Sequence, residues 1–97
     1  MKLEIIPLAQ SDIAAAAKYY GQQLQGLGDE FLAEVDATMA RITRDPLQFE
    51  QVRPGIRRCL LERFPYSIYY RLPDALTLRI IIVRHHNRRP NVGMRRQ

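Results

Sequence analysis

The side chains with the greatest chemical capacity gather in the second half of the chain. Residues 51–97 contain eleven arginines against two acidic residues, Glu62 and Asp74, and so carry a net charge of +9, whereas residues 1–50 carry −4. The planar guanidinium fork suits carboxylate and phosphate better than an ammonium group does. The pattern therefore indicates either a solvated basic face or a surface that binds an acidic partner or nucleic acid.

A few other residues could contribute a titratable or nucleophilic group. His85 ends an apolar segment, where we expect a hydrogen bond at a strand terminus, with acid–base catalysis and partner contact as the alternatives. We expect His86 to be exposed, Glu62 to pair with the surrounding arginines, and Cys59 to be an inert buried thiol. A single cysteine excludes an internal disulfide, and Cys59 has no neighbouring ligand-type residues that would make a zinc site.

The first half of the chain predicts a strand followed by two helices. Residues 3–6 form a short apolar stretch that ends at a proline. Apolar residues spaced three and four apart predict one helix within 8–25 and a second that ends before Asp45-Pro46. Gly26-Leu27-Gly28 separates the two, and Asp29 is expected to cap the second helix. Their apolar stripes need a covering layer.

The second half predicts that layer as an antiparallel sheet. Arg53-Pro54-Gly55 fits a type II turn, and Pro73-Asp74 separates two later apolar runs. Pro65 cannot donate to a ladder, so a bulge or a sheet edge is expected there. Alternation should place on one face Phe64, Tyr66, Ile68, Tyr70, Leu72, Leu76, Leu78, Ile80 and Ile82.

The element order predicts an α+β fold in a single domain of residues 1–97. An N-terminal strand and an antiparallel two-helix hairpin should pack on a mainly antiparallel sheet of the C-terminal strands. No apolar run is long enough for a signal peptide or a bilayer span, so we expect a cytoplasmic protein without membrane contact. Residues 88–97 contain four arginines and no hydrophobic period, which predicts a mobile basic tail that adds little to stability.

An ordered set of short motifs resembles the RelE/ParE superfamily of bacterial toxins, in particular its ParE-like, "plasmid stabilisation" branch. The matching residues extend over nearly the whole chain, and the set ends in the family's H-x-x-R-x-P form. In chain order they are Ala9, Asp12-Ile13, Tyr19-Tyr20, Leu27-Gly28, Phe31, Asp45-Pro46, Phe49, Gly55-Ile56-Arg57-Arg58, Arg63-Phe64-Pro65-Tyr66, Ile68-Tyr69-Tyr70 and His85-His86-Asn87-Arg88-Arg89-Pro90.

The resemblance implies the toxin of a type II toxin–antitoxin module, a ParE-like inhibitor of DNA gyrase that a cognate antitoxin neutralises through an acidic segment. It implies contact with operator DNA only through the antitoxin, and no cofactor or metal. The alternatives are a RelE-like ribosome-dependent endoribonuclease and a detoxified, antitoxin-binding co-repressor. Ser67 stands where similar nucleases tend to carry arginine, and the chain lacks their C-terminal His-Tyr or Tyr ending, which favours a non-enzymatic inhibitor.

Candidate residues follow for each role that the resemblance implies. An inhibitor has no catalytic residue, whereas a nuclease would use Arg57, Arg63, Arg84 and His85 to move protons and to stabilise the charged phosphate. Target binding is expected from Arg84, His85, Arg88, Arg89, Arg95 and Arg96. Antitoxin binding is expected from Arg57, Arg58, Arg63, Tyr66 and Arg71. Tyr66, Tyr69 and Tyr70 are expected to be amphipathic aromatics, with base stacking as their functional alternative.

Overall fold

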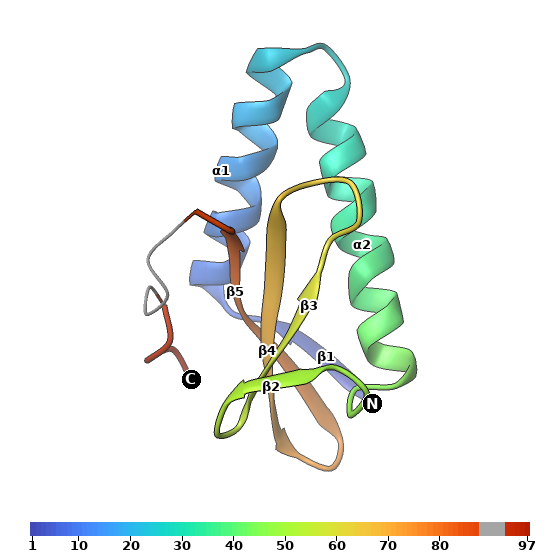
Figure 1. The fold of residues 1–97 in the computed structure, drawn as a ribbon, viewed down its shortest axis with the longest axis vertical. Helices are drawn as coiled ribbons and strands as arrows, with labels where there is room; N and C mark the ends of the chain where they lie inside the picture. The colour runs from blue at the N-terminus through green and yellow to red at the C-terminus, as the bar shows by residue number, and fades with distance from the viewer. Residues whose placement is uncertain (88–92) are drawn as a thin grey trace.

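The computed structural model describes residues 1–87 and 93–97, which form two helices and a five-stranded sheet (Figure 1). The elements in chain order are β1 (Lys2–Ile5), α1 (Pro7–Gln23), α2 (Leu27–Arg44), β2 (Glu50–Arg53), β3 (Ile56–Leu60), β4 (Tyr66–Asp74) and β5 (Thr77–His85). This is the α+β order expected from the sequence. No helix within the described ranges is both long and apolar enough to cross a bilayer.

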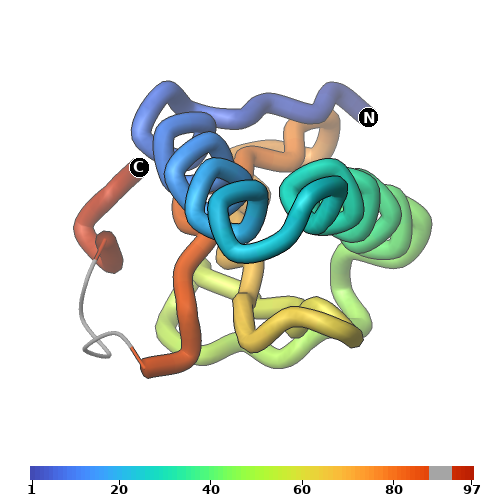
Figure 2. The backbone as a smooth tube through the Cα atoms, turned by 90° about the horizontal axis from the view of Figure 1, so that it is seen from above, coloured from blue at the N-terminus to red at the C-terminus, as the bar shows by residue number. Residues whose placement is uncertain are grey.

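The sheet has the strand order β1-β5-β4-β3-β2. Neighbours among β2 to β5 pair antiparallel, whereas β1 lies parallel to β5, from Lys2 beside Thr77 to Ile5 beside Ile80. Seen from above, β1 and β2, at the two edges of the twisted sheet, lie on opposite sides of the helical hairpin (Figure 2). The helices therefore cover one face of the sheet, called here the helix-side face, and the opposite face is called the second face.

The helices begin and end for local reasons. α1 starts with Pro7, whose missing N–H and fixed φ suit the first helical position. α2 follows Gly26, which has a φ of 85° and is the N-cap. Asp29 therefore lies inside the first turn of α2, and the prediction that it caps this helix is wrong. There its carboxylate still meets the positive end of the helix dipole. α2 ends at Arg44, before Asp45-Pro46, as predicted.

Most of the core lies between the hairpin and the helix-side face. Its aromatic part joins both layers, because Phe31 of α2 meets Phe64 at 5.2 Å and Tyr66 at 5.1 Å between ring centroids. Tyr20 of α1 completes this cluster, with its ring centroid 4.8 Å from that of Phe64. Edge-to-face contacts of this kind stabilise aromatic pairs beyond their area burial.

The alternation predicted for the last strand is interrupted by a bulge. Leu78 and Ile80 lie in the helix-side core as predicted, but Ile81 and Ile82 both lie in a smaller cluster on the second face. The register explains this, because Tyr69 pairs with Ile82 and the next residue of β4 pairs with Ile80, which leaves Ile81 as an extra residue. The placement predicted for Ile82 is therefore wrong.

Two smaller predictions around these strands also change, and a third is consistent with the structure. Leu76 lies in the turn before β5 and is 73% exposed, so it belongs to neither face. Phe64 contributes to the core from the loop before β4, and Pro65 lies in that same loop rather than at a bulge. Gly55 has a φ of 77°, as the predicted type II turn requires at its third position.

Residues 93–97 pack against the second face of the sheet. Met94 contacts the cluster of Ile56, Tyr69, Ile81 and Ile82. A Cβ on Gly93 would come within 2.9 Å of the Ile82 side chain, so the backbone of this segment lies directly on the strand. The predicted mobile tail is therefore wrong for residues 93–97, which we call the strap.

Candidate functional site

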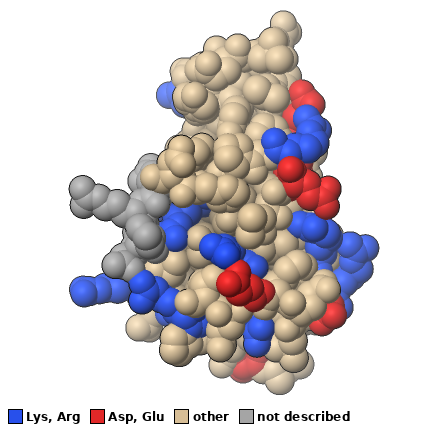
Figure 3. Space-filling model, viewed as in Figure 1, with Lys and Arg blue, Asp and Glu red and all other residues tan. Residues whose placement is uncertain are grey.

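Arginines from three different strands line a pocket on the second face. Strand direction points Arg58 of β3, Tyr69 of β4 and Arg84 of β5 away from the helices, and Arg53, the last residue of β2, lies beside them. With Val52 and Met94 these residues enclose about 250 Å³, which we call the basic pocket. Figure 3 views this face, where Lys and Arg side chains gather over the sheet in the lower half of the molecule.

Contacts within the basic pocket hold its guanidinium groups in place. The Arg84 guanidinium lies over the Tyr69 ring, 4.6 Å from its centroid, and its Nη2 donates to the Tyr69 hydroxyl at 3.0 Å. Arg58 pairs with Glu50 of β2. Burial opposes the charge of Arg58, but hydrogen bonds with Glu50 and Tyr69 outweigh it and raise the pKa of the guanidinium. Arg58 thus keeps its charge, as anion recognition requires.

The Nε of Arg58 is buried and has no hydrogen-bond partner among residues 1–87 and 93–97. A buried donor without a partner costs free energy, and in native structures it calls for a specific reason. Here the Arg58 side chain makes its ion pair through Nη2 alone, to a half-exposed carboxylate that an incoming acidic group could displace. The arrangement favours rebinding of Arg58 to an external carboxylate or phosphate.

His86 extends the basic surface beyond the end of β5. Its Nε2 lies 2.9 Å from the hydroxyl oxygen of Ser67, and its backbone N–H donates to Pro65. Ser67 is only 1% exposed, so its hydroxyl is not open to attack on a substrate. The pair therefore anchors the chain after β5 and leaves the exposed imidazole beside the basic surface.

The four residues proposed for a nuclease do not all converge, although Arg84 and His85 both line a hollow between α1 and β5. Arg57 lies on the helix-side face and donates to the carbonyl oxygens of Leu47 and Phe49. Arg63 is in the loop before β4 and pairs with Glu30 of α2 at 2.8 Å. The His85 ring packs edge-on against Tyr66 at 5.2 Å, and its Nδ1 accepts a hydrogen bond from Asn87. Arg84 alone of this set lines the basic pocket.

The residues proposed for partner binding are also divided. Arg58 and Arg84 lie together in the basic pocket, and Arg95 is exposed. Arg71 donates to the Arg96 carbonyl oxygen at 3.2 Å, so both residues belong to the strap contacts. Arg88 and Arg89 lie outside the described residues. Each of these roles in target or antitoxin binding stays a prediction.

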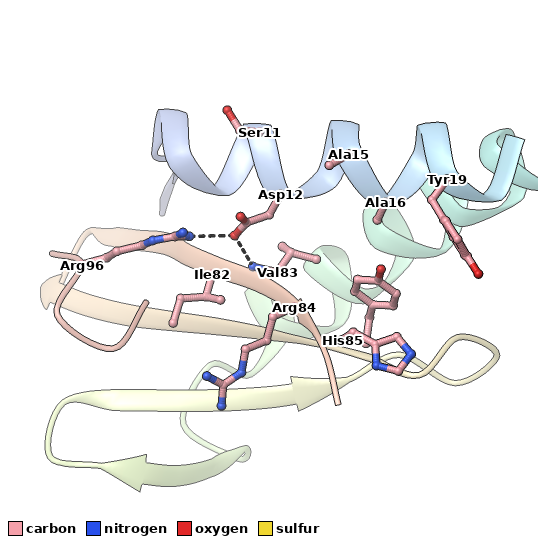
Figure 4. Close-up of a pocket in the computed structure, with 11 residues that line it drawn as sticks. Ser11, Asp12, Ala15, Ala16, Tyr19, Ile82, Val83, Arg84, His85 and Arg96 are labelled. Carbon is pink, nitrogen blue, oxygen red and sulfur yellow. Dashed lines mark hydrogen bonds and ion pairs between the residues drawn. The ribbon is translucent and has the colours of Figure 1, made fainter. Parts of the chain in front are cut away.

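A second hollow lies between α1 and the outer edge of β5. It measures about 350 Å³ and is lined by side chains of both elements and of the strap (Figure 4). Asp12 projects from α1 across this hollow to Arg96 and to the backbone N–H of Val83, while Tyr19 projects from the same helix at the other end of the hollow (Figure 4). The hollow is thus closed at one end by the contact between Asp12 and Arg96.

Sequence reasoning missed three residues of these sites, namely Arg53, Met94 and Asp12 as a contact of Arg96. Period-two alternation along β5 places Arg84 on the face of Leu78 and Ile80, and only the bulge at Ile81 turns it to the face of Arg58. The position of Arg53 beside the basic pocket follows only from the way the end of β2 pairs with β3. Nothing in the sequence pattern places Met94 or Arg96 on the sheet, because the segment has no period.

The described part of the chain contains no group of three His, Cys, Asp or Glu side chains able to hold a metal ion. Burial raises the pKa of the Cys59 thiol, despite the nearby Arg41 guanidinium. A thiol with a raised pKa is a poor nucleophile and a poor ligand at neutral pH. The chemistry that these sites can supply is therefore binding of anionic groups by arginine, with apolar contact around it.

Comparison with known proteins points to one family. A sequence model described as "ParE toxin of type II toxin-antitoxin system, parDE" matches residues 3–90. No curated protein matches the chain. A solved structure titled "Chromosomal ParDE TA system from P. aeruginosa" is similar in fold, with a TM-score of 0.71 and 20% sequence identity over 88% of this chain and 95% of that chain.

Proposed function

The chain belongs to the ParE toxin family of type II toxin–antitoxin systems, and from this premise we propose that it inhibits DNA gyrase and is neutralised by a cognate antitoxin with an acidic segment. The proposal describes a binding protein in the cytoplasm rather than an enzyme. The similar P. aeruginosa structure is a ParDE system, and an antitoxin of the same kind is the partner we propose for this chain.

One observation carries the non-enzymatic part of the proposal. Arg57 and Arg63, which a nuclease would need beside Arg84 and His85, are held elsewhere by partners within the chain, and the His85 ring packs against Tyr66 in the hollow that it shares with Arg84. General acid–base catalysis requires groups within hydrogen-bond reach of one reacting centre. The arginines that do converge, in the basic pocket, are fitted to bind carboxylates, which supports an inhibitor that acts by occupying a protein surface.

A second candidate function rests on the same pocket. Arg53, Arg58 and Arg84 beside the Tyr69 ring also suit an RNA backbone, and His86 lies at the end of the same strand as Arg84. This combination favours a RelE-like endoribonuclease over a purely structural role for the face. The two functions differ in their substrate and can be separated by experiment.

The test compares two activities of the same purified protein. Gyrase-catalysed supercoiling of relaxed plasmid should fall in proportion to the toxin added, and translation in a cell-free system should continue with full-length messages. Messages cut on ribosomes, with supercoiling unchanged, would establish the nuclease instead. Neither effect, from a protein that still binds antitoxin, would indicate the detoxified co-repressor.

Matched variants connect the outcome to the basic pocket. Arg84→Gln removes the guanidinium over Tyr69, whereas Arg95→Gln removes the same charge from an exposed position. We expect Arg84→Gln to reduce gyrase inhibition at least tenfold, as loss of one well-placed charged hydrogen-bonding group does in binding interfaces. Arg95→Gln should reduce it much less, and equal effects would show that only net charge matters.

A further inference from the structure

The outer edge of β5 is covered by β1 along its first part and by α1 and the strap beyond it. β1 pairs with β5 only as far as Ile80, whose carbonyl oxygen accepts the last bond from Ile6 at 3.2 Å. Beyond this point α1 and the strap lie beside the strand. An uncovered strand edge presents free N–H and C=O groups that can pair with another chain.

Two side chains meet these groups where β1 ends. Asp12 of α1 accepts a hydrogen bond from the Val83 N–H at 3.1 Å, and Arg96 of the strap donates to the Ile81 carbonyl oxygen at 3.0 Å. Together they satisfy an N–H and a C=O two residues apart, as a neighbouring strand would. Along this part of the edge of β5, two side chains therefore take the place of the backbone groups of a neighbouring strand.

The same two side chains bind each other. Nη1 of Arg96 lies 2.7 Å from Oδ2 of Asp12, and the side chains are only 19% and 22% exposed (Figure 4). Partly buried pairs of this kind are screened by solvent much less than surface pairs. Asp12 Oδ2 thus accepts from both Val83 and Arg96, which ties helix, strand and strap at one atom.

The strap that Arg96 holds also forms a wall of the basic pocket. Met94 packs on the second-face cluster and lines the pocket with Arg58 and Arg84. Arg71 and Arg79 fix the same segment by donating to the carbonyl oxygens of Arg96 and Gln97, at 3.2 Å and 2.9 Å. The position of Met94 therefore depends on contacts made elsewhere on the sheet.

We propose that Asp12 and Arg96 form a latch that closes the outer edge of β5 and, through the strap, sets the width of the basic pocket on the second face. Through the latch, Asp12 of α1 influences the basic pocket, which lies on the other side of the sheet. The latch rests on contacts within the chain, so its test is independent of whether gyrase is the target.

The test uses the methionine methyl groups as local probes. The chain has three methionines, of which Met94 lies in the strap and Met39 is buried in the helix-side core. With ¹³C-methyl methionine labelling, Arg96→Gln and Asp12→Ala should each move the Met94 signal toward that of a solvated methionine and leave the Met39 signal in place. Amide exchange of Val83, measured on the same samples, should become about tenfold faster, because Asp12→Ala removes the acceptor of the Val83 N–H and Arg96→Gln removes the group that holds this acceptor in place.

The double variant tests whether the two residues act as one unit. We expect Asp12→Ala with Arg96→Gln to change the Met94 signal and Val83 exchange hardly more than either single variant, because contacting residues are not additive. Asp36→Ala and Arg44→Gln alter the same charges at exposed positions outside the strap and should change neither probe. Exchange of the Ile68 amide, in the buried β4 strand, reports any loss of global stability.

Two results would overturn the latch. An unchanged Met94 signal in both single variants, with Val83 exchange at the wild-type rate, would show that neither residue holds the strap. Fully additive effects would show that Asp12 and Arg96 act separately. If the Met39 methyl signal and the exchange rate of the Ile68 amide changed in parallel with the Met94 signal, the variants would only loosen the whole fold. The latch would again be rejected.

Discussion

Replacing Gly28 by alanine should destabilise the protein, although alanine is the better helix former. Gly28 is the second residue of α2 and is buried against α1. A Cβ at this position would lie 2.6 Å from the carbonyl oxygen of Ala17 and 3.4 Å from the Cα of Gly21. All these neighbours are backbone atoms, so no side-chain rotation relieves the contact.

The size of the effect follows from two opposed contributions. The helices must separate by about 0.8 Å to turn the 2.6 Å approach into an ordinary contact, and overpacking of this kind costs about 1–3 kcal/mol. The higher helix propensity of alanine returns at most about 1 kcal/mol, and less in the first turn. We therefore expect a net loss of about 1–2 kcal/mol, which lowers Tm by about 5–10 °C for a chain of this size.

Gly21→Ala is the matched control. Gly21 lies in α1 close to the same crossing, but nothing lies within 4 Å of the position of its Cβ. This variant should gain about 0.5 kcal/mol from helix propensity alone. Thermal and urea unfolding followed by circular dichroism measure both changes. A Gly28→Ala protein as stable as the wild type, or equal shifts of one sign in both variants, would refute the close approach of the helices.

Three further predictions concern other parts of the molecule. Tyr70→Phe removes the hydrogen bond that the Tyr70 hydroxyl donates to the Pro46 carbonyl oxygen at 2.5 Å, and should lower the free energy of unfolding by about 1 kcal/mol in urea unfolding. In a spectrophotometric titration the variant should also lack one tyrosine, the one whose pKa is raised to about 12 by burial. The hydrogen bond from the Leu76 backbone lowers the pKa of Asp74, so the carboxylate contributes stability above its usual pKa of about 3.9 that is lost as the pH falls through the lowered value. The deficit of Asp74→Asn relative to wild type should therefore be largest near neutral pH and should shrink in acid; a deficit independent of pH would contradict this. Association with an acidic antitoxin should slow about tenfold between 50 mM and 500 mM salt in stopped-flow measurements, because opposite charges steer the encounter, and a rate indifferent to salt would exclude that steering.

The sequence alone was sufficient for the element order and for most of the core. Apolar spacing of three and four placed both helices, since only one stripe of each can meet a sheet. Strand alternation likewise placed Leu78 and Ile80 with Ile68 and Tyr70 against the hairpin. These predictions hold because a local period is preserved wherever one face of an element is buried.

The bulge at Ile81 could not be read from the same pattern. Ile80, Ile81 and Ile82 are alike in their side-chain chemistry, so their order in the sequence does not say which of them is the extra residue. The pairing with β4 decides it, and that pairing depends on residues ten or more positions away. The bulge then reverses the direction of the following side chains and brings Val83 to the helix-side face.

For the functional residues too, the sequence determined one part and the tertiary structure decided the other. Composition established that arginines dominate the second half and that anion binding is their shared capacity, because each guanidinium keeps its charge wherever it lies. Only the tertiary structure separates Arg58 and Arg84 in the basic pocket from Arg57, held by backbone carbonyls, and from Arg96, paired with Asp12. The partners that distinguish them are carbonyl oxygens and carboxylates brought near by folding, and the contact between residues 12 and 96 has no local signal in the chain.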